Sequence, residues 1–171
     1  MGHLIQVKDM ARNIDDRGSF TEVMRSDWSE LFGKDRVEQA NYSISFPGIV
    51  RAWHRHVQGQ SDTFVVLKGS LKICAYNDVE EEGKGELEEV VLSEDRLQAA
   101  RVIGKYWHGT KCVSSSPSQT LYFVTRLYNP LKPDELRRAW DDPAIVPSKI
   151  NGHSKDPRVG KAWDWNYIPF K

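Results

Sequence analysis

Short alternating or β-branched runs, separated by Gly, Pro and Asn, dominate the chain. Apolar side chains at every second position are typical of strands that bury one face. The predicted strands cover residues 4–7, 19–24, 37–45, 49–57, 62–68, 70–76, 86–92 and 118–128. Only residues 27–33 and 133–140 resemble short helices. Short strands with turn signals between them predict an all-β sandwich or barrel.

The size and charge of the chain narrow its class. Its 171 residues are enough for one domain with a core that needs no disulfide or structural metal. Basic and acidic residues balance at 24 each, so no overall charge attracts nucleic acid. No apolar run has the length of about 20 residues that a membrane-spanning helix needs, and the first residues lack the apolar stretch of a signal peptide. We expect a single cytoplasmic domain, residues 1–171, that binds neither nucleic acid nor membrane.

The cysteines and the C-terminal tail refine this expectation. Cys74 and Cys112 stand alone, which is typical of free thiols in a reducing compartment. From about residue 144 the chain is polar and carries Pro and Gly, and it ends in the aromatic sequence "AWDWNYIPFK". We expect these aromatic side chains to pack on the domain or on a second subunit.

The sequence "RAWHRH" at residues 51–56 is the first candidate for chemistry. Residues two apart on a strand point to the same face, so His54 and His56 are predicted to share one wall of a pocket. Trp53 and Trp107 each precede a histidine directly. Alternation therefore predicts that both tryptophans point to the opposite face, into the core.

The spacing of His54, His56, Asp62 and His108 resembles the two-part signature of the cupin superfamily. In metal-binding cupins an HxH pair, a carboxylate and a later histidine hold one divalent ion. Nitrogen and oxygen donors in that mixture suit Fe, Mn, Ni or Zn. A metal centre is therefore one interpretation of these residues.

A closer resemblance covers nearly the whole chain. In order, the sequence contains "DDRGSFTEVMR" (15–25), "QANYSIS" (39–45), "RAWH" (51–54), "GKGELEEVVLSED" (83–95), "YWHG" (106–109), "TLYFVTRLYNP" (120–130), "AWDDP" (139–143) and "HSKDP" (153–157). Together these segments are similar to the dTDP-4-dehydrorhamnose 3,5-epimerase family. The resemblance implies a metal-free cupin jelly roll with one or two short helices, assembled as a homodimer.

The resemblance also implies roles for individual residues. His54 matches the base that removes a proton beside the sugar ketone, and Asp142 matches the carboxylate that orients this base. Tyr122 matches the acid on the opposite face, and His108 matches a histidine of the keto-sugar pocket. Tyr128 lies near the aromatic residue that stacks on the nucleotide base. The other residues that match contacts with the nucleotide, diphosphate or sugar are Arg17, Phe20, Glu22, Gln39, Asn41 and Arg51.

Two departures from the family's pattern leave the chemistry open. The lysine that helps to stabilise the enolate is replaced by Asp62, and a glutamine two residues after the base is replaced by His56. A protonated His56 could supply the missing positive charge. Alternatively, both changes complete the metal-binding set of His54, His56, Asp62 and His108. A bound metal would stabilise the enolate as a Lewis acid and would occupy His54.

The sequence therefore predicts an isomerase that acts on a nucleotide-linked 4-keto-6-deoxy sugar, by epimerisation at carbon 3, carbon 5 or both, in deoxysugar or polysaccharide biosynthesis. We expect no cofactor, a nucleotide-sugar substrate and a homodimer, with His54, Tyr122, Asp142, His108 and His56 as catalytic residues. The alternatives are a metal-dependent cupin enzyme and a catalytically silent protein that binds sugar nucleotides.

Overall fold

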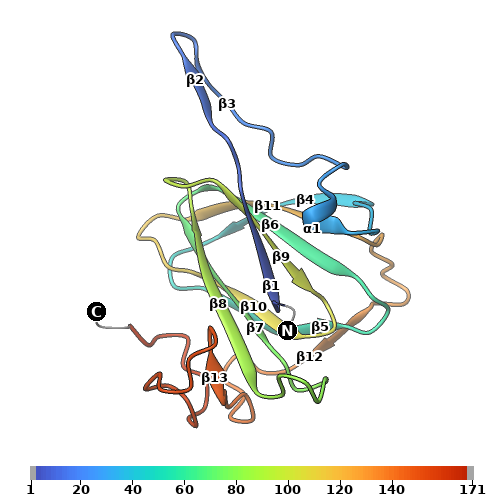
Figure 1. Ribbon diagram of the computed structural model, residues 1–171, viewed down its shortest axis with the longest axis vertical. Helices are drawn as coiled ribbons and strands as arrows, with labels where there is room; N and C mark the ends of the chain where they lie inside the picture. Colours follow the sequence, from blue (N-terminus) through green and yellow to red (C-terminus); the bar gives the residue numbers. More distant parts are fainter. Residues whose placement is uncertain (1–2, 169–171) are drawn as a thin grey trace.

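The computed structural model describes residues 3–168 and is nearly all β (Figure 1). One sheet has five strands. In spatial order they are β1 (Ile5–Asp9), β9 (Gln98–Ile103), β6 (Ser61–Lys68), β11 (Ser118–Val124) and β4 (Gln39–Ser45). All neighbouring strands in this sheet are antiparallel. Two-stranded hairpins and longer antiparallel connections of this kind are typical of jelly rolls.

The second sheet has six strands. In spatial order they are β12 (Glu135–Arg137), β5 (Val50–His56), β10 (Trp107–Cys112), β7 (Ser70–Tyr76), β8 (Glu86–Ser93) and β13 (Lys149–Ile150). The inner faces of the two sheets share one apolar core. Phe64 and Val102 of the first sheet pack there with Leu71, Ile73 and Leu92 of the second. The predicted all-β sandwich is thereby confirmed.

The outer faces of both sheets are also covered. The short helix α1 (Ser29–Phe32) places Leu31 and Phe32 against Val65 and Ala99 of the five-stranded sheet. This helix confirms the helical prediction for residues 27–33. Among residues 3–168, no helix is long and apolar enough to cross a membrane.

The C-terminal segment covers the six-stranded sheet. The ring centroid of Trp165 lies 4.9 Å from that of Trp53, and Trp163 and Trp107 belong to the same buried cluster. The aromatic tail therefore packs on its own domain, although residues 169–171 lie outside the described part of the chain. Trp53 and Trp107 are core residues, as alternation predicted.

Several parts of the secondary structure differ from the prediction. The strand predicted over residues 19–24 ends at Phe20. Residues 133–140 form no helix, because residues 135–137 pair with β5 as β12. A free sheet edge gains hydrogen bonds from such pairing, which outweighs a modest local helix preference. The sequence pattern also missed β9 and β10. Cys74 and Cys112 are buried free thiols, as predicted.

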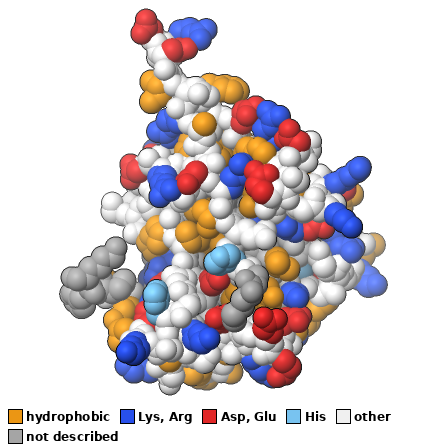
Figure 2. All heavy atoms as spheres, in the orientation of Figure 1, with side chains coloured by type: hydrophobic (Ala, Val, Ile, Leu, Met, Phe, Trp, Pro, Cys, Tyr) orange, Lys and Arg blue, Asp and Glu red, His pale blue; other side chains and the backbone are white. Residues whose placement is uncertain are grey.

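A hairpin of β2 (Asn13–Asp15) and β3 (Gly18–Phe20) projects from the body of the molecule (Figure 1). Figure 2 shows charged side chains at its tip and hydrophobic ones just below. Ile14 is 76% exposed and Phe20 is 66% exposed. The hairpin thus presents apolar surface away from the rest of its own chain.

Candidate functional site

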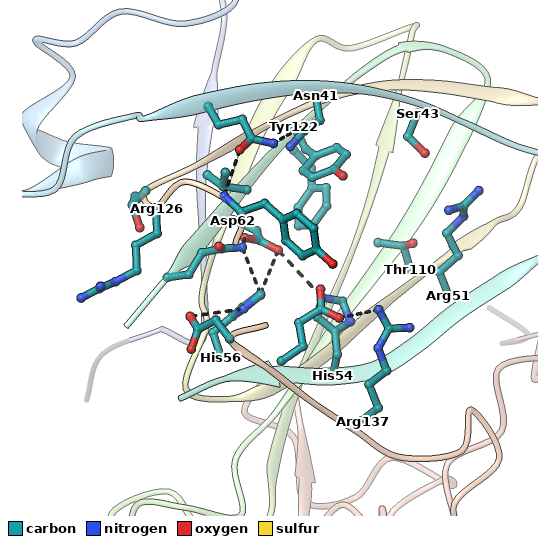
Figure 3. A pocket seen from close by; sticks show the side chains of 18 of the residues that line it. Asn41, Ser43, Arg51, His54, His56, Asp62, Thr110, Tyr122, Arg126 and Arg137 are labelled. Carbon is teal, nitrogen blue, oxygen red and sulfur yellow. Dashed lines mark hydrogen bonds and ion pairs between the residues drawn. The ribbon is translucent and has the colours of Figure 1, made fainter. Parts of the chain in front are cut away.

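A large cavity lies between the two sheets at the end that carries the histidines (Figure 3). Its volume is about 1280 Å³, which exceeds the roughly 300–1,000 Å³ of most small-ligand sites. His54 and His56 on β5 contribute to one wall, while Asp62 on β6 and Tyr122 on β11 contribute to the other. The cavity therefore has room for a ligand larger than a single sugar.

Three histidines meet at one buried carboxylate. Asp62 Oδ2 lies 3.5 Å from His56 Nε2, 3.5 Å from His108 Nε2 and 3.9 Å from His54 Nε2. One nitrogen or oxygen atom of each residue lies within 4.8 Å of all the others. The shared pocket wall predicted for His54 and His56 is present; His108 lies beside His54 on the neighbouring strand, and Asp62 approaches the histidines from the facing sheet.

Strand pairing and two glycines bring these residues together. In the β5–β10 pair, His108 lies opposite His54. A Cβ atom on Gly109 would lie 2.2 Å from Ala52 Cβ, so only glycine permits this approach of the strands. A Cβ atom on Gly104 would lie 1.9 Å from the Gln60 carbonyl oxygen and 2.9 Å from His56 Cδ2. The close backbone contacts at Gly104 and Gly109 therefore hold the strands that carry the cluster in place.

The surroundings shift the pKa values of His54, His56 and Asp62 in different directions. Burial, followed by the neighbouring His108, lowers the pKa of His54 to about 4, so His54 is neutral at neutral pH. Burial opposes ionisation of Asp62, but contact with the three imidazoles outweighs it and holds the pKa of that carboxyl well below its usual range. Burial likewise opposes the charge on His56, but Asp62 outweighs it and raises the pKa of His56.

Polar groups behind the cluster orient two of its rings. His108 Nδ1 lies 2.9 Å from the carbonyl oxygen of Tyr106. A carbonyl can only accept, so Nδ1 of His108 carries a proton that it donates to Tyr106, and Nε2 is the ring atom that faces Asp62. The Gln60 side-chain amide donates to Asp62 Oδ1 at 2.8 Å and lies 3.2 Å from His56 Nε2. These contacts fix the direction in which the donor atoms point.

Tyr122 lies on β11 of the five-stranded sheet, beside Asn41 and on the cavity wall across from the histidines (Figure 3). Its ring stacks on Phe64 with a centroid distance of 6.0 Å. Burial raises the pKa of the Tyr122 phenol, with a further contribution from Asp62, so the hydroxyl keeps its proton at neutral pH. Tyr122 therefore presents a protonated hydroxyl within the cavity whose other wall carries His54.

Asp142 does not accompany His54 as the resemblance implied. Its carboxylate accepts a hydrogen bond from the Ala144 amide at 2.9 Å and lies 3.8 Å from Arg138 Nε. Asp142 is not among the described residues that line the cavity. The carboxylate that His54 approaches is Asp62, at 3.9 Å, whereas Asp142 lies in the turn that follows β12.

The predicted substrate-binding residues fall into two groups. Gln39, Asn41, Arg51 and Tyr128 line the cavity. Gln39 Nε2 donates to Asn41 Oδ1 at 2.7 Å, and Gln39 Oε1 accepts from the Tyr128 amide at 3.1 Å. This end of the cavity is therefore held together by side-chain hydrogen bonds.

The second group lies outside the cavity, on and beside the projecting hairpin. Arg17 pairs with Asp15 at 2.5 Å, and Glu22 pairs with Arg25 at 2.8 Å. Phe20 is exposed on the hairpin. None of Arg17, Phe20 and Glu22 lines the cavity of its own chain.

Sequence reasoning missed a charged rim on the cavity. Arg126 and Lys132 follow β11, and Glu135 and Arg137 belong to β12. In the pairing of β12 with β5, Glu135 lies opposite His56 and Arg137 lies opposite His54. Glu135 and Arg137 form an ion pair. The helical interpretation of residues 133–140 concealed this rim; an alternating interpretation would have placed Glu135 and Arg137 on one face.

Residues 13–136 match the sequence pattern described as the polysaccharide biosynthesis C-terminal domain, which is more than half of the chain. The chain belongs to this family. Within it, the chain is 42% identical over 140 residues to the "Probable low-salt glycan biosynthesis epimerase Agl13" of Haloferax volcanii, covering 81% of this chain and 88% of that protein. It is 34% identical over 143 residues to the "Spore coat polysaccharide biosynthesis protein SpsL" of Bacillus subtilis, covering 82% and 91%.

Solved structures place this family member in a known fold. The RmlC epimerase of Mycobacterium tuberculosis superposes with a TM-score of 0.73 at 21% identity, covering 88% of this chain and 78% of that one. The 3'-monoepimerase ChmJ of Streptomyces bikiniensis, in complex with dTDP-quinovose, superposes with a TM-score of 0.74 at 19% identity, covering 98% and 79%. These likenesses confirm the cupin jelly roll implied by the resemblance to the dTDP-4-dehydrorhamnose 3,5-epimerases.

Proposed function

We propose that the chain is an epimerase in polysaccharide biosynthesis that acts on a nucleotide-linked 4-keto-6-deoxy sugar. The observation that carries this proposal is the placement of His54 and Tyr122 on opposite walls of one cavity. Inverting a carbon requires that a proton leaves from one face and that another arrives on the opposite face. Agl13 and the proteins of the RmlC and ChmJ structures are all named as epimerases, which supports the same reaction class.

The ketone of such a sugar makes the neighbouring C–H bonds acidic. In the cation-free protein, His54 removes the proton from carbon 3 or carbon 5, and an enolate forms. Tyr122 then donates its phenolic proton to the same carbon from the other side. His56, held against Asp62 at 3.5 Å, supplies the positive charge that the lost lysine gives in the resembled family.

The rest of the cavity suits the nucleotide. Arg51, Arg126, Lys132 and Arg137 line it, and guanidinium groups bind diphosphate oxygens with paired hydrogen bonds. Tyr128 is exposed at the edge of the cavity and is available to stack on a base. We therefore assign the diphosphate to the charged rim and the keto sugar to the histidine end. The buried free thiols Cys74 and Cys112 fit a cytoplasmic location.

The test is NMR of dTDP-4-keto-6-deoxyglucose with cation-stripped protein in deuterated buffer. We expect deuterium at carbon 3, carbon 5 or both, because each abstracted proton is replaced from solvent. In His54→Ala the exchange rate should fall by about 10²–10⁴-fold, the usual contribution of a general base. If nucleotide binds but neither exchange nor inversion occurs with or without added metal, the chain is a sugar-nucleotide-binding protein and the proposal fails.

We also propose that the chain forms a homodimer. Arg17 and Phe20 match substrate contacts of the resembled family, yet they lie on a hairpin that projects from its own domain. They would meet a substrate only in another chain's cavity. Analytical ultracentrifugation should give the mass of two chains, and the double substitution Ile14→Ser, Phe20→Ser should shift it toward one. A wild-type monomer at micromolar concentration would contradict the dimer.

A further inference from the structure

We propose that Trp165, in the C-terminal segment, is a positioning residue that fixes the direction of His54. This inference rests on the proposed function, because it concerns the residue that acts there as the base. Residue 165 lies outside residues 13–136, the part of the chain that matches the family pattern, so that match assigns no role to it. The strand that carries His54 is irregular at the point where Trp165 packs on it.

Strand β5 contains one extra residue directly before His54. In its pairing with β10, His54 lies opposite His108 and Arg51 lies opposite Thr110. Three steps along β5 thus match two steps along β10, which is a β-bulge at residues 52–53. In a regular strand, residues three apart point to opposite faces, whereas here Arg51 and His54 both line the cavity (Figure 3). The shape of the bulge therefore sets where His54 points.

The bulge is held from the neighbouring strand and from the outer face of the sheet. On β10, a Cβ atom on Gly109 would lie 2.2 Å from Ala52 Cβ, so the two backbones approach closely there. On the outer face, the ring centroid of Trp165 lies 4.9 Å from that of Trp53. Trp53 is 1% exposed, and its indole nitrogen makes no hydrogen bond within residues 3–168. Packing, with Trp165 in direct contact, therefore holds the Trp53 side chain in place.

Trp165 also connects the three adjacent strands behind this wall of the cavity. Its indole nitrogen donates to the carbonyl of Trp140, which follows β12, at 3.1 Å. Its own carbonyl accepts a hydrogen bond at 2.9 Å from Nζ of Lys111 on β10. Trp53 lies on β5, between those two strands. One residue of the C-terminal segment thus ties the end of β12 to β5 and β10, the strands that carry the three histidines of the site.

The direction of His54 matters for the rate because a base must point at the C–H bond that it breaks. Misplacing a catalytic group by about 1 Å can lower the rate by about 10²-fold. Without the Trp165 ring, the bulge can relax toward the outer face and turn His54 away from the sugar. Gln39 and Tyr128 line the cavity from β4 and from the loop after β11, so they keep their places. The expected signature is a loss of kcat with little change in KM.

The test compares Trp165→Ala with a matched core variant, Ile150→Ala, in the kinetics of inversion. Ile150 is 1% exposed and belongs to the same buried cluster, but it lies on β13, which pairs with β8 and is three strands away from β5. Both proteins are assayed at a temperature at which circular dichroism shows that they are folded. We expect kcat to fall about 10–100-fold in Trp165→Ala and to stay within about threefold of the wild-type value in Ile150→Ala.

Two further substitutions at this position separate positioning from stability. Trp165→Phe keeps an aromatic ring against Trp53 and loses the hydrogen bond to the Trp140 carbonyl. We expect it to recover most of the wild-type kcat. Trp165→Leu fills part of the space with an apolar side chain that is not aromatic, and its kcat should lie between those of Trp165→Ala and Trp165→Phe. If Trp165→Ala fails to fold, Trp165→Leu takes its place in the comparison with Ile150→Ala.

A second readout needs no substrate. The ring centroids of His54 and His108 are 4.1 Å apart, close enough for a nuclear Overhauser effect between their ring protons. At constant pH, we expect the His54 ring resonances to shift and this effect to weaken in Trp165→Ala, with neither change in Ile150→Ala.

Either of two results would overturn the proposal. One is a folded Trp165→Ala protein with the kcat of Ile150→Ala. The other is a set of His54 ring resonances in Trp165→Ala that matches the wild type. If the wild type itself neither exchanges nor inverts, the proposed function fails, while the histidine resonances still decide whether Trp165 positions His54.

Discussion

Replacing Tyr122 with phenylalanine is expected to reduce the rate of inversion by about 10²–10⁴-fold, the usual contribution of a positioned acid. The substitution removes only the hydroxyl. The ring keeps its stacking contact with Phe64 at 6.0 Å, so the fold and the nucleotide affinity should change little. Rates of product formation, measured by NMR or chromatography at saturating substrate, check this expectation.

A sharper readout separates proton removal from proton return. In the cation-free Tyr122→Phe protein, His54 still removes the proton and can return a deuteron to the same face. We therefore expect deuterium in recovered substrate without inverted product. Tyr42→Phe is the matched control, since Tyr42 lies on β4 directly opposite Leu121 and is exposed away from the cavity. Normal inversion by Tyr122→Phe would exclude Tyr122 as the acid.

Replacing Trp165 with alanine is expected to lower the free energy of unfolding by about 3–5 kcal/mol, as large-to-small core substitutions do. Trp165 is 1% exposed. It packs at 4.9 Å on Trp53 and at 6.1 Å on Trp163, and its indole nitrogen donates to the Trp140 carbonyl at 3.1 Å. The substitution removes all of these side-chain contacts at once.

Urea denaturation followed by circular dichroism gives this free energy. Trp140→Ala is the matched control, because Trp140 is 46% exposed and its carbonyl stays available to Trp165. We expect the control to cost clearly less than Trp165→Ala, since it removes less buried area. A Trp165→Ala protein as stable as the wild type would contradict the stabilising role of this side chain.

The local pattern predicted much of the site because strand alternation is strictly periodic. His54 and His56 share a face and Trp53 takes the other, as residue spacing alone requires. The resemblance to the cupin signature grouped Asp62 with the three histidines, but its actual position beside them depends on how β6 faces β5. That relationship between sheets is set by long-range packing and is absent from local spacing.

The missed elements have identifiable physical causes. β9 carries Ala99 and Ala100, poor strand formers that bury opposite faces, one beneath α1 and one between the sheets. No alternation can appear where both faces are buried. The helical prediction for residues 133–140 failed because the edge of β5 recruits residues 135–137. Glu135 and Arg137 were therefore overlooked. The assignment of Asp142 came from the family resemblance, and the structure places Asp142 outside the cavity.

The distribution of histidines gives the protein a built-in spectroscopic reporter. Three of the five histidines meet at Asp62, while His3 and His153 are exposed. At constant pH, ring resonances in a histidine-labelled sample would thus separate into a buried set that senses ligands in the cavity and a surface set that serves as an internal reference. Events at the centre of the cavity can be followed in the intact, unmodified chain, with two resonances that stay still while three respond.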